Sequence, residues 1–277
     1  MAQKRNKAAL IAVGGHEDKT RDKQILRKVV ESLRVKKVVV ATVASSVADE
    51  MWRDYRKAFG ALGVETVHLK IQARTDATDD PRLDLLEGAG GLFFTGGDQV
   101  AITAKMGGTI LCERMHELHQ QGKLVVAGTS AGASVLTETM VVSGADEKSH
   151  RAGSALLMAP GLGFLPGTVI DQHFAERGRI SRLLGIVAQN PRTLGIGIDE
   201  NTAIVVEGDT FEVVGEGAVY VLDGRPITHT NLNEQEADKT ISVFDVRVHV
   251  LSHGDRYQME ARRPEAPKGS EVPAESA

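Results

Sequence analysis

One serine lies in a turn whose composition suits a nucleophile. Ser130 is the centre of the run Gly-Thr-Ser-Ala-Gly at 128–132, which follows the apolar stretch 124–127 and precedes a helical pattern. In a strand–turn–helix of this kind, small neighbours permit a strained backbone that projects the serine Oγ above the sheet. The start of the helix offers unpaired N–H groups to a developing oxyanion. The pattern predicts a serine nucleophile; a phosphate-binding turn or a turn without chemistry are the alternatives.

A serine nucleophile needs a base and a carboxylate that orients the base. His173 directly follows a short apolar strand, which places it at the edge where the ligand sites of parallel sheets gather. Asp199 and Glu200 end the run 195–198, again at a strand edge, and either can accept a hydrogen bond from an imidazole. The alternative for each is a carboxylate that only caps a turn. The order serine, histidine, carboxylate differs from that of α/β-hydrolases, so a shared turn does not require a shared fold.

A glycine pair and three arginines are expected near the same edge. Gly96-Gly97 follows a strand, and glycine there lets backbone N–H groups approach a ligand, so this turn is a candidate second half of the oxyanion hole. An ordinary strand-to-helix turn is the alternative. Arg177, Arg179 and Arg182 follow the histidine, and guanidinium groups bind carboxylates through paired hydrogen bonds. We expect a substrate with free carboxylates here, against the alternative of a solvated basic helix face.

The elements that must position these residues alternate between strands and helices in the first half of the chain. Apolar runs that do not alternate with polar residues indicate strands buried on both faces, as in a parallel sheet. Repeated strand–helix units predict a doubly wound α/β architecture. The expected strands are 8–13, 37–43, 64–71, 91–95 and 124–127, and the expected helices are 19–33, 49–62 and 99–121, the last broken at Gly107-Gly108.

Short strands at close spacing are predicted for the second half. They are expected at 168–170, 202–206, 210–214, 218–221 and 241–251, with a helix at 179–189. Gly208-Asp209 signals a hairpin, so β-hairpins are expected to extend the end of the sheet. From Arg262 the composition turns to Pro, Glu, Lys, Gly, Ser and Ala, which bury too little apolar surface to fold. We expect a single α/β hydrolytic domain over 1–262 and a disordered tail over 263–277.

Composition excludes several classes of protein. The net charge of −4 argues against a nucleic-acid partner, which needs a basic face. No apolar segment approaches the roughly 18 residues of a membrane span, and the first apolar stretch is too short for a secretion signal, so we expect a cytoplasmic protein. The single cysteine, Cys112, excludes an internal disulfide framework and is expected to be a buried thiol. His116 and His119 are spaced to share a metal ion but have no adjacent third ligand, so no metal site is predicted.

Together these motifs resemble the cyanophycinases, within the serine peptidase family that also holds the aspartyl dipeptidases (peptidase E). The resemblance covers about residues 8 to 255 in order. It includes the runs 14–19, 95–99, 128–132 and 195–203. Its most specific part is the run Asp-Gln-His-Phe at 171–174 with the three arginines and a leucine that follow.

The resemblance implies a flavodoxin-like or class I glutamine-amidotransferase-like α/β fold and a homodimer. It implies that Ser130 is the nucleophile, His173 the base and Glu200 the orienting acid. The substrate pocket that it implies consists of Gln99, Asp171, Gln172, Arg177, Arg179 and Arg182. We expect an acyl transfer without metal or organic cofactor, with backbone N–H groups at Gly97, Asp98 and Ala131 as the oxyanion hole.

The implied substrate is cyanophycin, a polyaspartate with arginine attached to each side-chain carboxyl, cut from an end into β-Asp-Arg dipeptides. Each unit carries an arginine α-carboxylate for the three arginines, and a guanidinium for which Asp171, Glu17 or Asp18 are candidate partners. Two features depart from the family's pattern: His16 stands where a small residue is expected, and Val100-Ala101-Ile102 contains no arginine. The alternatives are a related enzyme for short α- or β-aspartyl peptides and a non-catalytic sensor of an anionic metabolite.

Overall fold

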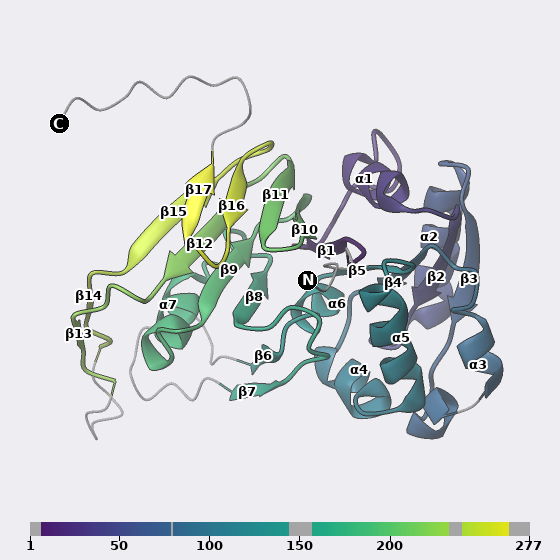
Figure 1. Ribbon diagram of the computed structural model, residues 1–277, viewed down its shortest axis with the longest axis horizontal. Coiled ribbons are helices and arrows are strands. Elements are labelled where there is room, and N and C mark those ends of the chain that lie inside the picture. The colour runs from purple at the N-terminus through teal and green to yellow at the C-terminus, as the bar shows by residue number, and fades with distance from the viewer. Residues whose placement is uncertain (1–6, 79, 144–156, 233–239, 266–277) are drawn as a thin grey trace, which may run out of the picture.

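The computed structural model describes residues 7–78, 80–143, 157–232 and 240–265. Its two larger sheets lie side by side (Figure 1). The N-terminal half of the chain, purple to teal, forms the parallel part of the larger sheet with its helices. The C-terminal half, green to yellow, forms the smaller sheet and the antiparallel part of the larger one.

The larger sheet has, within the described residues, nine strands in the order β17-β16-β11-β10-β1-β5-β4-β2-β3. One half is parallel and consists of β1 (Leu10–Val13), β5 (Val125–Thr129), β4 (Gly91–Phe94), β2 (Lys37–Ala41) and β3 (Glu65–Leu69). The other half is antiparallel and consists of β10 (Thr202–Glu207), β11 (Thr210–Gly215), β16 (Arg256–Gln258) and β17 (Arg263–Glu265). Strand β1 joins the halves, because it pairs with β5 in parallel and with β10 antiparallel.

Helices cover both faces of the parallel half. Alternate residues of a strand point to opposite faces, and here Val38 and Val40 of β2 pack in one apolar cluster while Val39 packs in another. The first cluster includes residues of α1 (Gln24–Ser32) and α2 (Ala48–Gly60). The second includes residues of α4 (Gln99–Met106), α5 (Ile110–Gln120) and the short α6 (Ala131–Ser134). A 3₁₀ helix (Arg74–Thr78) and α3 (Asp80–Asp84) lie between β3 and β4 in the chain.

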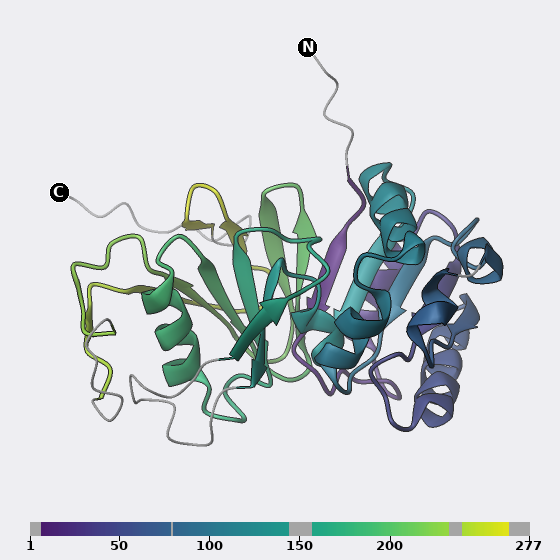
Figure 2. The ribbon, with the colours of Figure 1, turned by 90° about the horizontal axis from the view of Figure 1, so that it is seen from below.

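The smaller sheet supplies the other elements around the candidate site. Its order is β15 (Arg247–Leu251), β12 (Val219–Asp223), β9 (Leu194–Ile198) and β8 (Thr168–Gln172), with β8 and β9 parallel. Helix α7 (Ile180–Gln189) packs on this sheet (Figure 2). Two further strand pairs are β6 (Thr139–Ser143) with β7 (Leu157–Pro160), and β13 (His229–Thr230) with β14 (Val243–Phe244).

The α/β class predicted from the alternating pattern is confirmed, and so is the helix break at Gly107-Gly108, since α4 ends at Met106 and α5 begins at Ile110. The expectation that all later hairpins extend one sheet is wrong. Hairpin β10–β11 joins β1, but β12 and β15 pair with β8 and β9 in the separate sheet. A strand pattern shows which side chains are buried and does not show which strand is the neighbour, so this division is a tertiary outcome.

Three boundaries also differ from prediction. Helix α1 begins at Gln24 rather than at 19, because the Asp18 carboxylate accepts the N–H groups of Thr20, Arg21 and Lys23 and holds this segment as a loop. The strand expected over 241–251 is interrupted at Asp245, which has a φ of 62°. Residues 263–265 form β17 against β16, although the sequence placed them in the tail; residues 266–277 lie outside the described residues.

Burial or bonds to the backbone account for three side chains that were candidates for a chemical role, Cys112, His116 and His119. Cys112 is buried in α5, and burial raises the pKa of its thiol. His116 and His119 each bond a backbone carbonyl oxygen, and their rings lie 4.0 and 5.5 Å from the ring centre of Phe164.

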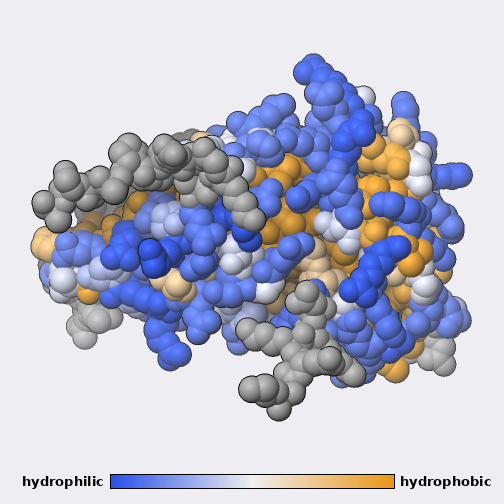
Figure 3. All heavy atoms as spheres, turned by 45° about the horizontal axis from the view of Figure 1, so that its top comes forward, coloured by the Kyte–Doolittle hydropathy of each residue, from blue (hydrophilic) through white to orange (hydrophobic). Residues whose placement is uncertain are grey.

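The face in Figure 3 is largely hydrophilic, with apolar side chains visible between the polar ones. Within the described part of the chain, no helix is long and apolar enough to cross a bilayer.

Candidate active site

Three side chains from distant parts of the chain form one hydrogen-bonded line. The Ser130 Oγ lies 2.9 Å from the His173 Nε2, and the His173 Nδ1 lies 2.6 Å from the Glu200 Oε1. Because the carboxylate can only accept, the Nδ1 donates to it and the Nε2 is left to accept from the serine hydroxyl. This is the arrangement in which an imidazole removes a proton from a serine nucleophile.

The backbone holds Ser130 in a conformation that few residues adopt. It lies between β5 and α6 with φ 53° and ψ −115°, and its N–H donates to the Val13 carbonyl oxygen at 3.0 Å. A Cβ on Gly128 would collide with the carbonyl of Gly132, and one on Gly132 would lie 2.8 Å from the Phe94 Cβ. Both glycines are therefore required by close packing around the turn, as the sequence pattern predicts.

His173 is held at the end of β8 by the loop that follows β1. Its φ is 47°, and its N–H donates to the Gly14 carbonyl oxygen at 2.9 Å. The imidazole lies over Gly15, where a Cβ would come within 2.7 Å of the Nε2. Gly15 itself has a φ of 113°, which L-residues rarely adopt. Gly15 therefore makes room for the imidazole.

The two adjacent carboxylates after β9 have different roles. Glu200 bonds His173, whereas the Asp199 carboxylate accepts the N–H groups of Ala175 and Ala218 at 2.9 and 3.0 Å. Asp199 thus connects the loop after His173 to the start of β12. Sequence reasoning from the residues alone left both open, and the geometry places only Glu200 against the imidazole.

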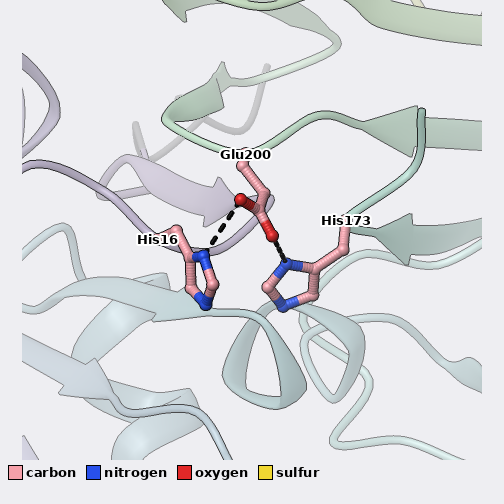
Figure 4. Close-up of side chains that lie close together, drawn as sticks. All are labelled: His16, His173 and Glu200. Carbon is pink, nitrogen blue, oxygen red and sulfur yellow. Dashed lines mark hydrogen bonds and ion pairs between the residues drawn. The ribbon is translucent and has the colours of Figure 1, made fainter. Parts of the chain in front are cut away.

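His16 is a neighbour of this line that the sequence analysis noted only as a departure. Its Nδ1 lies 3.0 Å from the Glu200 Oε2, and its ring meets the His173 ring edge-on at 5.1 Å (Figure 4). The side chain is 73% exposed and its φ is 50°. Glu200 therefore accepts from two imidazoles, one on each carboxylate oxygen. No pattern in the sequence could indicate this, because the contact joins the β1 loop to the β9 loop.

The same three side chains are the only group of possible metal ligands found in the described part of the chain. The ligand atoms of His16, His173 and Glu200 lie within 4.8 Å of one another. Their lone pairs and protons are directed at each other in hydrogen bonds rather than at a common centre. The geometry therefore fits a proton-transfer line better than a preformed metal site.

Charge and burial change the proton affinities of this line. Burial lowers the pKa of His173; the Glu200 hydrogen bond acts against this, and the Arg177 charge adds to it. Burial acts to raise the pKa of Glu200, but the hydrogen bond from His173 and the His16 charge outweigh it, so the net direction is down. A carboxylate that stays ionised beside a neutral imidazole is the state that a general base requires.

A cavity of about 540 Å³ opens beside Ser130, and cationic side chains line much of it. Arg177, Arg179 and Arg182 all reach it from the segment before and at the start of α7, where the helix N-terminus also favours anions. Burial lowers the pKa of Arg179 to about 10, so this guanidinium is still protonated at neutral pH. Gln99 and Gln172 line the cavity as well, and the Gln99 Nε2 is held by the Val141 carbonyl oxygen at 2.8 Å.

The resemblance implies that Asp171 belongs to the substrate pocket, but Asp171 does not face this cavity. It is 1% exposed and binds Arg182 through both carboxylate oxygens, with the Arg182 Nε 2.8 Å from the Oδ2. The Arg179 Nη1 lies 3.2 Å from its Oδ1. With its oxygens occupied by two guanidinium groups, Asp171 positions the arginines and is not available for a substrate cation.

Asp18 and Glu17 are the other two candidate partners for a substrate guanidinium. Asp18 is engaged with backbone N–H groups of its own loop and does not line the cavity. Glu17 lines it, and its buried carboxylate accepts from Tyr55 and from the Thr129 Oγ1, the latter at 2.6 Å. The Lys19 Nζ lies 3.3 Å from the Glu17 Oε1. The Glu17 side chain is fully buried and both of its oxygens are bonded, so Glu17, like Asp171, is not available to a substrate cation.

The predicted oxyanion hole needs one correction. The Asp98 N–H donates to the Ala44 carbonyl oxygen at 2.9 Å, and its carboxylate caps α4 by accepting the Val100 N–H, so this amide is already used. Gly97 and Ala131 remain as candidates. Ala131 is the first residue of α6, where an N–H has no acceptor within the helix, and Gly97 lines the cavity with Ser130.

Comparisons with known proteins show similarity to one peptidase family. The model of peptidase family S51 matches residues 9–214. The cyanophycinase of Synechococcus elongatus is 36% identical over 262 residues, covering 93% of this chain and 81% of the relative. That of Geminocystis herdmanii is 32% identical over 265 residues, covering 94% and 97%.

Solved structures show the same fold. A peptidase from an acI-B1 Actinobacterium has a TM-score of 0.69 at 23% identity, covering 92% of this chain and 98% of that one. A putative peptidase E from Listeria monocytogenes has a TM-score of 0.54 at 17% identity, covering 76% and 100%. The flavodoxin-like, class I glutamine-amidotransferase-like fold expected from the sequence is thereby confirmed. The family model spans most of the chain and both of the relatives named above exceed 30% identity, so the chain belongs to peptidase family S51.

Proposed function

We propose that this chain is a serine exopeptidase that hydrolyses cyanophycin to β-Asp-Arg dipeptides. The observation that carries the proposal is the line Ser130–His173–Glu200 at the wall of a cavity lined by three arginines. Similarity to cyanophycinases over more than nine-tenths of the chain supports the substrate. Each unit of that polymer ends its side chain in an arginine α-carboxylate, which a guanidinium fork can bind through two hydrogen bonds.

The reaction follows from the positions of the side chains. His173 takes the proton of the Ser130 hydroxyl as the Oγ attacks the carbonyl carbon of an aspartyl residue. The oxyanion that forms accepts from the N–H groups of Gly97 and Ala131. His173 then gives its proton to the leaving nitrogen, and water releases the acyl group by the same steps in reverse order. Glu200 holds the imidazole in the tautomer whose Nε2 accepts.

One group of the substrate can be assigned to the arginines of the cavity. We assign the arginine α-carboxylate to Arg177, Arg179 or Arg182, which Asp171 orients from behind. Glu17 is fully buried and its two oxygens are bonded by Tyr55 and Thr129, so we assign the substrate guanidinium to neither Glu17 nor Asp171. Burial, followed by the Glu17 charge, raises the pKa of Tyr55 well above its ordinary value, so Tyr55 stays a donor that holds this carboxylate in place.

Digestion of purified cyanophycin with mass analysis of the products tests the function. The expected products are β-Asp-Arg dipeptides that accumulate from the start of the reaction, because an exopeptidase releases one unit at a time. A parallel panel of α- and β-aspartyl dipeptides distinguishes the related dipeptidase activity. Cleavage of the panel with intact polymer would refute cyanophycin as the substrate.

Gly15→Ala is expected to lower kcat by about 10² or more, because the added Cβ displaces the His173 ring and small misplacements of a catalytic group have effects of this size. Gly63→Ala is the matched control, since Gly63 also has a positive φ (74°) but no atom within 4 Å of the added Cβ. Both variants bear the strain of a positive φ. Comparable kcat values for the two would contradict the proposed contact. Hydrolysis rates are measured alongside thermal unfolding.

When kcat/KM is plotted against pH, its fall on the acid side is expected at a pH below the ordinary histidine pKa of about 6.5. This fall is the acid limb of the profile. The neutral His173 is the base, and its lowered pKa means that activity is lost only when the pH falls through this lower value. Arg177→Gln removes a positive charge that disfavours the imidazolium, so the limb should move to higher pH. Arg56→Gln, at an exposed position of α2, serves as the control. A limb that stays in place or moves to lower pH in Arg177→Gln would contradict the assignment of the base.

We also propose a homodimer, as the resemblance implies, and a location in the cytoplasm, as the sequence composition predicts. Strand β15 is the edge of the smaller sheet and exposes Val248 and Val250, at 48% and 61%. An edge strand with exposed apolar side chains is a common pairing surface. Light scattering of the purified chain and fractionation of cells test the two points separately.

A further inference from the structure

The Glu200 carboxylate is held in place by side chains alone. Its side chain is 27% exposed, and in the described part of the chain no backbone N–H donates to the carboxylate. The adjacent Asp199, by contrast, accepts two backbone N–H groups. The terminal torsion of a glutamate side chain has a broad energy minimum, so a carboxylate bonded at one oxygen can rotate about it. The orientation of Glu200 therefore depends on what bonds its second oxygen.

His16 supplies that second hydrogen bond. Its Nδ1 lies 3.0 Å from the Glu200 Oε2, while the His173 Nδ1 lies 2.6 Å from the Oε1. A carboxylate only accepts, so the His16 Nδ1 carries a proton and donates. Figure 4 shows the two imidazoles with each Nδ1 directed at a different oxygen of the carboxylate. The carboxylate is thus fixed at both oxygens.

The loop after β1 holds the backbone of His16 in place, although the side chain is 73% exposed. The Asn201 N–H donates to the Gly15 carbonyl oxygen at 2.8 Å, directly before His16. The Asn201 Oδ1 accepts the Asp18 N–H at 2.9 Å, two residues after it. Asn201 directly follows Glu200, so these bonds join the backbones from which the His16 and Glu200 side chains extend. The contact between them is therefore built into the two loops.

We propose that His16 is a positioning residue for the reaction of Ser130. By donating to the Glu200 Oε2 it keeps the Oε1 on the His173 Nδ1, and this keeps the imidazole oriented with its Nε2 toward the serine hydroxyl. His16 acts through Glu200 and does not itself take the serine proton. The inference rests on the proposed function, because it adds a residue to the same peptidase site.

His16→Gly removes the donor, and glycine adopts the φ of 50° at this position without strain. Its kcat should fall by about 10- to 100-fold, since small misplacements of a catalytic group have effects of this size. KM should stay near that of the unmodified chain, because the role of His16 is to orient Glu200. Thermal unfolding should also change little, because an exposed pair of this kind contributes little to stability.

His16→Asn is the conservative variant that should restore activity. The asparagine Nδ2 takes the place of the imidazole Nδ1 and also donates, and asparagine tolerates a positive φ. Its kcat should therefore lie within a few-fold of the unmodified chain, although the ring is absent. His253→Gly is the matched control, since His253 is an exposed histidine outside the cavity, and its kcat should be unchanged.

Two rates are measured in each of these chains. Hydrolysis of cyanophycin gives kcat and KM. Labelling by a fluorophosphonate reports the activation of Ser130 without the polymer, because the Oγ displaces fluoride from phosphorus while His173 takes the hydroxyl proton. His16→Gly is expected to slow both reactions and His16→Asn to restore both. Labelling of the unmodified chain without hydrolysis of the polymer would refute only the proposed substrate, and the labelling rates would then decide the role of His16.

Three results would overturn the role of His16 in an active chain. They are unchanged rates in His16→Gly, equal losses in His16→Gly and His16→Asn, and a raised KM at unchanged kcat, which would assign His16 to substrate binding. An unmodified chain that neither hydrolyses the polymer nor is labelled would overturn the proposed function together with this inference.

Discussion

Ser130→Ala is expected to lower kcat for cyanophycin hydrolysis by on the order of 10⁴–10⁶, the range found when a triad nucleophile is removed. The loss follows because the Oγ at 2.9 Å from the imidazole is the atom that forms the acyl bond. The fold should be preserved, because alanine keeps the small side chain that the turn at φ 53° accommodates. Rates of dipeptide release and thermal unfolding curves measure the two effects.

Ser134→Ala provides the matched control for this prediction. Ser134 lies in the same turn of chain, in α6, and is 2% exposed, but it does not line the cavity. Its variant should hydrolyse the polymer within a few-fold of the unmodified chain. Substantial hydrolysis by a folded Ser130→Ala would contradict the nucleophile, and equal losses in both variants would indicate damage to the turn.

Glu200→Gln is expected to lower kcat by about 10³–10⁴, the size of effect seen when the orienting acid of a triad is replaced by its amide. The amide can present an N–H to the His173 Nδ1, which then becomes the acceptor, and the Nε2 becomes a donor that cannot take the serine proton. The variant also loses the negative charge that stabilises the imidazolium during the reaction. Hydrolysis rates at saturating polymer measure the effect on kcat.

Asp199→Asn distinguishes this role from that of the adjacent carboxylate. Asp199 accepts two backbone N–H groups, and an asparagine would turn a donor toward one of them, at a cost of about 1–3 kcal/mol in stability. This variant should unfold at lower temperature while its kcat falls less than about tenfold. The reverse pattern, with Asp199→Asn inactive and Glu200→Gln active, would assign the orienting acid to Asp199.

Much of the fold was predictable because its determinants are local. The runs around Val38–Val40 and Val125–Ala127 are apolar at every residue, which only strands covered on both faces require, and the structure covers both faces with helices. Gly107-Gly108 ends α4 because two glycines disfavour a continued helix. The later start of α1 was not predictable from periodicity, since the apolar pattern continues through a loop that the Asp18 side chain holds.

The candidate site, like the fold, was predictable from the sequence only in part. The sequence by itself determined the turn around Ser130, because close packing of its two glycines is a local demand, and it determined that His173 and a carboxylate follow strands. Only the tertiary structure decided that β8 and β9 form a second sheet whose loops bring Glu200 to the imidazole, and that the loop after β1 brings His16 to Glu200. The tertiary structure also decided that the Asp171 carboxylate accepts from Arg179 and Arg182, and that the Asp98 N–H donates to the Ala44 carbonyl oxygen. The physical reason is that hydrogen-bond partners far apart in the chain are chosen by strand pairing and loop packing, and residue types and spacing do not encode that choice.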